Sequence, residues 1–315
     1  MLKAKNKSNF TKNSKILIGL TAILACLYFL SFTRACTSKD SRGKIKSSLV
    51  NQKYKDSINR LELADASGSL TIKKEGSFWT VSAADTDTDA GSSNSLPAAP
   101  ERIENLLENL INIRNLYKIS DKINQNSAFG LTNGTEFHLR YYTDDAFHEL
   151  IFGNQDFSLS SRYMMTEKST QVYEIDNSLD TYLTTSIQSW AEPYIISQTV
   201  FGKITPQDIQ RTTVENQNHL SSISDLQKLL DLRHGGSPDQ EEIFSLLQNH
   251  QIPERTITLE LGNKKEIELR IYPTKIENEF IVITEYKTQK GKSPAFTSAS
   301  KISSWTYNKI KENAL

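Results

Sequence analysis

An uncharged apolar run near the N-terminus constrains this chain most. Residues 16–32 contain no charged side chain, and residues 1–15 before them carry five lysines and no acid. Seventeen helical residues would span about 25 Å, close to what a helix needs to cross the hydrocarbon core of a membrane. The run is apolar on every side, unlike the amphipathic helix of a soluble protein. It predicts a transmembrane anchor with a cytoplasmic N-terminus and an extracytoplasmic remainder.

Two processing alternatives stay open for this segment. A cleaved signal peptide would end at a small-x-small site, and Ala22 with Ala25 forms a poor one. A lipoprotein signal would modify Cys26, but apolar residues continue beyond it, and the other cysteine, Cys36, follows Arg34 too closely. Because both cysteines lie here, the rest of the chain has no disulfide framework and no thiolate metal site.

Charge excludes one class of partner. Lysine plus arginine and aspartate plus glutamate both number 37, so the formal net charge is zero. A neutral chain without a basic stripe has no field that would gather nucleic acid, so no nucleic-acid partner is expected.

The first folded region combines apolar strands with one striped helix. Short strands are expected between residues 58 and 81, before a low-complexity loop at 82–99. Pro100 suits the first position of a helix, which the apolar spacing predicts over 101–116, and a four-stranded meander follows over 135–175. The stripe consists of Ile103, Leu106, Leu107, Leu110, Ile111 and Ile113. Its Ile103, Leu107, Leu110 and Ile111 side is expected to pack on the meander.

A second region repeats this order. Residues 255–286 alternate as strand, turn, strand, turn and strand, after helices expected near 222–232 and 239–249. Two copies of one unit would pack as a pair of lobes. The predicted fold class is α+β: an N-terminal transmembrane helix followed by two similar lobes of antiparallel β-meander covered by helices. The predicted divisions are a tail and anchor at 1–33, a basic stalk at 34–56, a first lobe at 57–195 and a second lobe at 196–315.

No catalytic, cofactor-binding or metal-binding residue is predicted. The hydrolase nucleophile elbow, the P-loop and the dinucleotide fingerprint are all missing from the sequence. His138 and His148 lie on adjacent predicted strands and could face each other across a turn, but a zinc site would need a third ligand nearby. Trp79, Trp190 and Trp305 are expected to pack in the core or between a sheet and a helix rather than to form a ligand platform.

Several short segments carry a family resemblance over roughly residues 56–200. They are Leu61-Glu62-Leu63, the segment 72–81, the helix containing Leu106-Leu107-Glu108-Asn109-Leu110, Phe129-Gly130-Leu131, Leu150-Ile151-Phe152-Gly153, Arg162-Tyr163 and Gln171-Val172-Tyr173. In this order the chain resembles a bacterial envelope family, domain of unknown function 4340, which is associated with ABC-transporter genes of the gliding-motility type. The family supplies no catalytic residues. The resemblance implies a membrane-anchored accessory protein that works with an ABC-type permease.

The expected function is therefore a non-catalytic accessory or scaffold subunit of an ABC-transporter-type complex. The expected location is the inner membrane, crossed once and bound through residues 16–32, with the C-terminal domain outside the cytoplasm. The alternatives are a lipoprotein location and, for function, a periplasmic hydrolase or carbohydrate-binding protein whose site is assembled from scattered residues.

Overall fold

The computed structural model describes residues 21, 23–25, 28, 43–44, 48–84, 94–112, 116–121, 127–132, 134–144, 146–167, 169–215, 217–219, 222–248, 251–289 and 293–314. The chain divides into two compact units, Met1–Lys44 and Ile45–Leu315. In the first unit, the short strand β1 (Gly43–Lys44) follows a few described helical residues. The second unit holds the elements described below.

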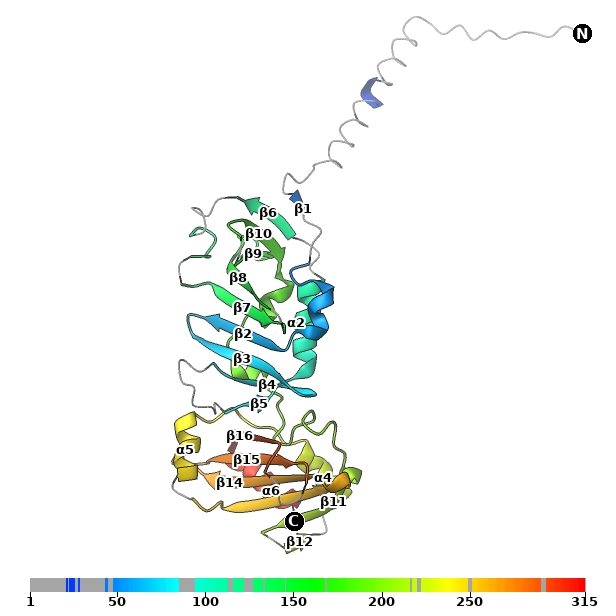
Figure 1. The fold of residues 1–315 in the computed structure, drawn as a ribbon, viewed down its shortest axis with the longest axis vertical. Helices are drawn as coiled ribbons and strands as arrows, with labels where there is room; N and C mark the ends of the chain where they lie inside the picture. The colour runs from blue at the N-terminus through cyan, green and yellow to red at the C-terminus, as the bar shows by residue number, and fades with distance from the viewer. Residues whose placement is uncertain are drawn as a thin grey trace, which may run out of the picture. The chain divides into compact units, whose positions relative to one another are not determined.

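Strands dominate the second unit, and this corrects the fold class expected from the sequence. Two antiparallel sheets form its framework, with short helices on their faces (Figure 1). Among the described residues no helix is long and apolar enough to cross a membrane, and most of residues 16–32 lies outside them. The α+β class with an N-terminal transmembrane helix was therefore wrong. The physical reason for the higher strand content is that the segments between residues 60 and 83 pair with the meander and extend its sheet.

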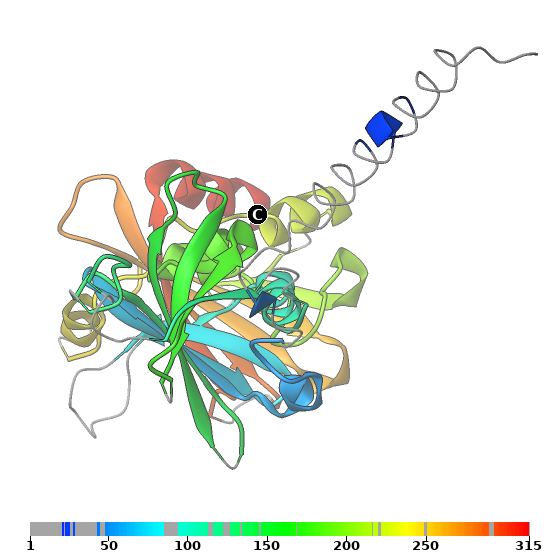
Figure 2. The same ribbon diagram turned by 90° about the horizontal axis from the view of Figure 1, so that it is seen from above.

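The first sheet is a single antiparallel ladder. Asp65 Oδ1 accepts hydrogen bonds from the N–H groups of Ser67 and Gly68, at 2.8 and 3.2 Å, and so shapes the first hairpin turn. The ladder runs through β6 (Leu116–Ser120), β10 (Val172–Asp176), β9 (Ser161–Thr166), β8 (Phe147–Gln155), β7 (Phe137–Tyr142), β2 (Arg60–Asp65), β3 (Gly68–Glu75), β4 (Phe78–Ala83) and β5 (Leu96–Pro97). Seen from above, its strands fan out, as the twist of a sheet requires (Figure 2).

One helix, α2 (Pro100–Ile111), covers a face of the first sheet. Ile103, Leu107 and Leu110 are buried in the same core as strand residues such as Leu61, and Ile111 is half-buried against that core, as the apolar stripe predicts. The helix ends earlier than the predicted 101–116, at Asn112, whose N–H donates to the Glu108 carbonyl.

Residues assigned to the stalk close the C-terminal end of α2. The N–H groups of Leu49 and Val50 donate to the Leu110 carbonyl at 3.1 and 3.2 Å, satisfying an acceptor that the helix leaves open. Val50 is fully buried. The folded part therefore begins before residue 57.

The second sheet has helices on both faces. Its order is β12 (Gln217–His219), β11 (Ile209–Val214), β13 (Arg255–Leu261), β14 (Glu266–Pro273), β15 (Glu279–Lys287) and β16 (Phe296–Ser303). Helices α4 (Ile223–Leu230) and α6 (Ser304–Ala314) contact each other and cover one face. Helix α5 (Gln240–Gln248) packs Leu246 on the other face, apart from α4 and α6 in both views (Figures 1 and 2).

The two sheets share a strand order. Each begins with a hairpin, β2–β3 or β11–β12, whose first strand pairs with the first strand of a four-stranded meander, β7–β10 or β13–β16. Between hairpin and meander the chain forms α2 in the first case, and α4 and α5 in the second. Ala191 belongs to the first core and Ile195 to the second, and the lobe boundary at residue 195 stays a prediction. The remaining short helices are η1 (Gln52–Ser57), η3 (Asn177–Tyr182), α3 (Ile187–Trp190), η4 (Pro206–Asp208) and η5 (Gly262–Lys264).

Candidate functional site

The two histidines singled out in the sequence lie on opposite faces of the first sheet. His138 pairs with Ile151, and its imidazole lies 3.0 Å from Glu149 on the face away from α2. His148 instead pairs with the buried Tyr141, and their rings stack at 4.9 Å. Side chains alternate along a strand, and the register offsets these histidines by an odd number of positions, so they cannot face each other. No group of three or more potential metal ligands occurs among the described residues.

A shallow trough of about 590 Å³ crosses the face of the first sheet that α2 leaves open. Its floor is made of small side chains, including Ser69 and Thr71, and its walls carry Arg60, Arg140 and Lys73. Nearby carboxylates neutralise these cations: Arg140 pairs with Glu149 at 2.8 Å, Lys73 with Glu75 at 2.9 Å and Arg60 with Glu62. The trough therefore offers paired donors and acceptors rather than a cationic site for a phosphate or a nucleic acid.

A buried polar cluster lies where the chain passes from the first sheet to the second. The Glu192 carboxylate accepts hydrogen bonds from the Ser197 hydroxyl at 2.6 Å, the Gln198 N–H at 2.6 Å and the Thr199 hydroxyl at 3.1 Å. Burial raises the pKa of Glu192 despite these bonds. His234 Nε2–H donates to the Glu192 carbonyl at 2.8 Å, and burial lowers the pKa of His234.

The cluster does not form a nucleophile–base pair. His234 Nδ1 is buried and has no hydrogen-bond partner among the residues that the structure describes. His234 Nε2 is bound to a main-chain carbonyl, so neither nitrogen contacts the Ser197 hydroxyl. The Tyr286 hydroxyl, whose pKa burial raises, accepts from the Ser197 N–H at 2.6 Å. These bonds join the connection between the sheets to β15, and that is a structural role.

Stability is expected to depend on pH with opposite signs at Glu192 and His234. The lowered pKa of His234 means that its contribution is full above about pH 6.5 and is lost as the pH falls below that value. The raised pKa of Glu192 means that its contribution is full below about pH 4.5 and is lost as the pH rises. Urea unfolding between pH 4 and 8 should show that His234→Gln removes the first dependence and Glu192→Gln the second. Unchanged pH profiles in both variants would contradict this assignment.

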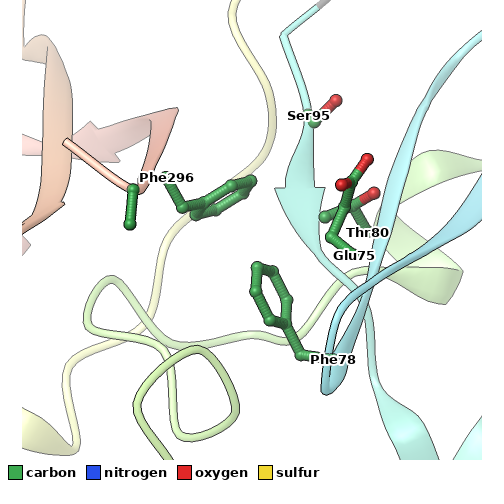
Figure 3. A pocket seen from close by; sticks show the side chains of 6 residues that line it. Glu75, Phe78, Thr80, Ser95 and Phe296 are labelled. Carbon is green, nitrogen blue, oxygen red and sulfur yellow. The ribbon is translucent and has the colours of Figure 1, made fainter. Parts of the chain in front are cut away.

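A smaller pocket of about 240 Å³ lies between the first and second sheets. Figure 3 shows Phe78 and Phe296 pointing toward each other; their rings meet edge to face at 5.2 Å. Nearby, the Asn94 side chain donates to the Ala299 carbonyl at 2.7 Å and accepts from the Ala299 N–H at 2.9 Å. The volume of this pocket is below the range of about 300–1,000 Å³ that is usual for small-molecule sites, so we interpret the pocket as a packing contact.

The surface around α5 is unusually apolar for an exposed helix. Ile243 and Leu246 contact the second sheet, whereas Phe244 and Leu247 are 58% and 53% exposed. A groove of about 550 Å³ lies along the other side of α5, where Glu242, Ser245 and Leu246 line it together with the exposed Ile276. We call Phe244 and Leu247 the α5 surface; three positions apart on the helix, they share one face, and each is an exposed large apolar side chain. Such gatherings mark binding surfaces more often than isolated apolar residues do.

The tryptophans only partly follow the sequence prediction. Trp190 is fully buried, and its Nε1–H donates to the Thr184 carbonyl at 3.0 Å. Trp79 is half-buried against the first core. Trp305 is instead largely exposed at the start of α6, so its predicted core position was wrong. It lies on a helix whose buried side is formed by Tyr307 and Ile310.

The fold defines a mostly β protein with two antiparallel sheets. The family described as Domain of unknown function (DUF4340) matches residues 90–252, just over half of the chain, and the chain belongs to this family. The match starts later than the resemblance expected from the sequence and extends through α5. No curated protein and no solved structure matches the chain.

Proposed function

We propose that this protein is a non-catalytic accessory or scaffold subunit of an ABC-transporter-type membrane complex of the bacterial envelope. The observation that carries this proposal is the α5 surface. Helix α5 has more apolar side chains than the second sheet covers, because Ile243 and Leu246 face that sheet while Phe244 and Leu247 face solvent.

Burial against a partner would offset the cost of this exposure. Removing a leucine or phenylalanine side chain from water contributes about 1.5–3 kcal/mol, so the α5 surface offers enough apolar area for the centre of an interface. An apolar helix face of this kind suits docking into an apolar groove of another protein.

The location stays a prediction. An extracytoplasmic position, and attachment through residues 16–32 or through a lipidated Cys26, rest on sequence and lie largely outside the described residues. The partner, an ABC-type permease, is proposed from the family resemblance, because genes of the resembling family are associated with ABC-transporter genes.

The proposal is tested by isolating the tagged full-length protein from its own membranes in mild detergent. A permease subunit of the ABC type is expected to co-isolate with it. Phe244→Lys combined with Leu247→Lys should reduce the co-isolated permease at least tenfold, because two cations cannot enter an apolar interface without a partner.

Ile223→Lys is the matched control, since Ile223 is 63% exposed on a different helix, α4. This variant should retain the permease. The proposal fails if no ABC-type subunit co-isolates, or if the double variant retains it as fully as the control does.

The trough on the first sheet favours a second candidate, a carbohydrate-binding protein. Its guanidinium and carboxylate groups alternate beside a floor of small side chains, an arrangement that can bind sugar hydroxyls without net charge. Calorimetric binding of a soluble cell-wall glycan fragment that Arg140→Ala abolishes would favour this function over the first. An unchanged permease interaction in the same variant would show that the two surfaces act independently.

A further inference from the structure

The turn between β8 and β9 holds two apolar side chains in solvent. We call residues 156–161 the β8–β9 turn; its sequence is Asp-Phe-Ser-Leu-Ser-Ser. Phe157 has a relative exposure of 105% and Leu159 of 64%. No other large apolar side chain among the described residues is as exposed as Phe157.

Hydrogen bonds fix the backbone of this turn. Asp156 Oδ1 accepts from the N–H groups of Ser160 and Ser161, both at 3.0 Å, and Asp156 Oδ2 accepts from the Ser158 hydroxyl at 2.5 Å. The Leu159 N–H donates to the Asp156 carbonyl at 3.1 Å. These bonds, with the Ser158 hydroxyl first, lower the pKa of Asp156 to about 2, so its carboxylate remains an acceptor at physiological pH. The backbone that carries the apolar pair is therefore held in one conformation.

Leu159 occupies a backbone conformation that favours glycine. Its φ is +57°, in the left-handed region, where a branched side chain is disfavoured. Glycine or asparagine would fit the turn with less strain and would expose no apolar surface. Backbone strain and apolar exposure therefore coincide at Leu159. Packing does not explain them, because Leu159 is not part of the first core.

The surroundings of the turn are acidic. Besides Asp156, the neighbouring strand β10 contributes Asp176 and Glu174. Asp176 pairs in register with Ser161, and the Glu174 carboxylate accepts a hydrogen bond from the Ser161 hydroxyl at 2.6 Å. Arg162 is the nearby cation, and Asp180 pairs with it at 2.6 Å. An acidic rim is repelled by an anionic lipid surface and attracted by a basic protein surface.

We propose that Phe157 and Leu159 form an anchor that inserts into an apolar pocket with a basic rim on another protein. Because the turn backbone is already ordered, binding costs the conformational entropy of the two side chains only, and aromatic anchors are frequent among interface hot spots. The proposal rests on the proposed function for the identity of that partner, the ABC-type permease. The chemistry of the pocket follows from the turn alone.

Site-specific photo-crosslinking in cells tests the anchor. Benzoylphenylalanine replaces Phe157 in the full-length chain, and in a control chain it replaces Phe147, which is exposed at the opposite end of β8. Irradiation is expected to give one protein adduct from position 157 and none from position 147. The crosslinked peptide should be apolar and should lie beside lysine or arginine residues.

A second substitution separates binding from folding. Leu159→Gly, introduced beside the crosslinker, should reduce the adduct at least tenfold while leaving the melting temperature of the protein unchanged or higher, because glycine relieves the strained φ. When the irradiation is repeated on isolated membranes, raising the salt concentration should also reduce the adduct, because salt screens the acidic rim.

Each of the following results would overturn the anchor: an adduct only with lipid, an adduct only with a second copy of this chain, an adduct that Leu159→Gly leaves unchanged, or a melting temperature that Leu159→Gly lowers. An adduct with a different membrane protein that has the expected pocket would support the anchor while contradicting the proposed permease partner. A permease that co-isolates normally while position 157 gives no adduct would overturn the anchor and leave the proposed function intact.

Discussion

Leu106→Asp is expected to unfold the first sheet, whereas Asn105→Asp, at the neighbouring position, is expected to leave it folded. Leu106 is fully buried under the sheet in the core that α2 shares with β2, β3 and β7, and Asn105 is exposed. Truncating such a leucine to alanine already costs about 2–5 kcal/mol, and an unpaired buried carboxylate adds a further desolvation cost. The sum approaches the whole stability of a typical domain, about 5–15 kcal/mol.

Hydrogen exchange measured strand by strand checks this result. Leu106→Asp should abolish protection in β2, β3 and β7, while Asn105→Asp should keep the protection pattern of the unaltered protein. Because both variants gain the same side chain at adjacent helix positions, a difference between them reports burial rather than helix propensity or net charge. Equal protection in the two variants would show that α2 does not hold the first sheet together.

The parts predicted well from sequence are those that local periodicity determines. The stripe that begins at Ile103 specifies both the helix and its buried side, and the alternation of Phe137, Leu139 and Tyr141 specifies a half-buried strand. Strand β16 was missed because its sequence, Phe-Thr-Ser-Ala-Ser-Lys-Ile-Ser, offers small polar side chains where strands usually have branched apolar ones.

Long-range pairing accounts for the error in fold class. β2 lies beside β7 in the sheet although more than 70 residues separate them in the chain, and no local pattern encodes such a ladder. The same register decides that His138 and His148 face opposite sides. A sequence shows that two strands are adjacent more readily than it shows which residues they pair.

The buried polar cluster and the exposed turn were harder still to predict. The Glu192 cluster depends on a contact with His234, 42 positions away, and neither residue belongs to a motif. Phe157 and Leu159 are isolated apolar residues in a serine-rich turn, and their significance depends on exposure and on a positive φ that only a structure provides. The one sequence feature that pointed to this turn was a pair of apolar residues in a turn segment, where polar residues are usual.

Two glycine-containing motifs of the family resemblance meet in space. The segment of Phe129, Gly130 and Leu131 lies on the second face of the first sheet, and the Asn154 N–H donates to the Phe129 carbonyl at 2.8 Å. Leu131 is buried there with Ile151 and Val172. The strand approaches so closely because Gly153 has no side chain: a Cβ added there would lie 2.1 Å from the Phe129 carbonyl oxygen.

Gly153→Ala is therefore expected to detach residues 127–132 from the sheet. A methyl group cannot occupy a space 2.1 Å from a backbone oxygen, so either the segment or β8 must move. Overpacking of this kind costs about 1–3 kcal/mol, and exposing Leu131 to water costs a further 1.5–3 kcal/mol, roughly.

Gly68→Ala is the matched control, because nothing lies within 4 Å of the Cβ position at Gly68. Urea unfolding should place Gly153→Ala at least 2 kcal/mol, on the order of the overpacking cost, below Gly68→Ala. Hydrogen exchange should show the loss of protection concentrated at residue 154, whose N–H depends on the Phe129 carbonyl. If the two variants were equally stable, the contact between the two motifs would not contribute to folding, and the proximity of these glycines would need another explanation.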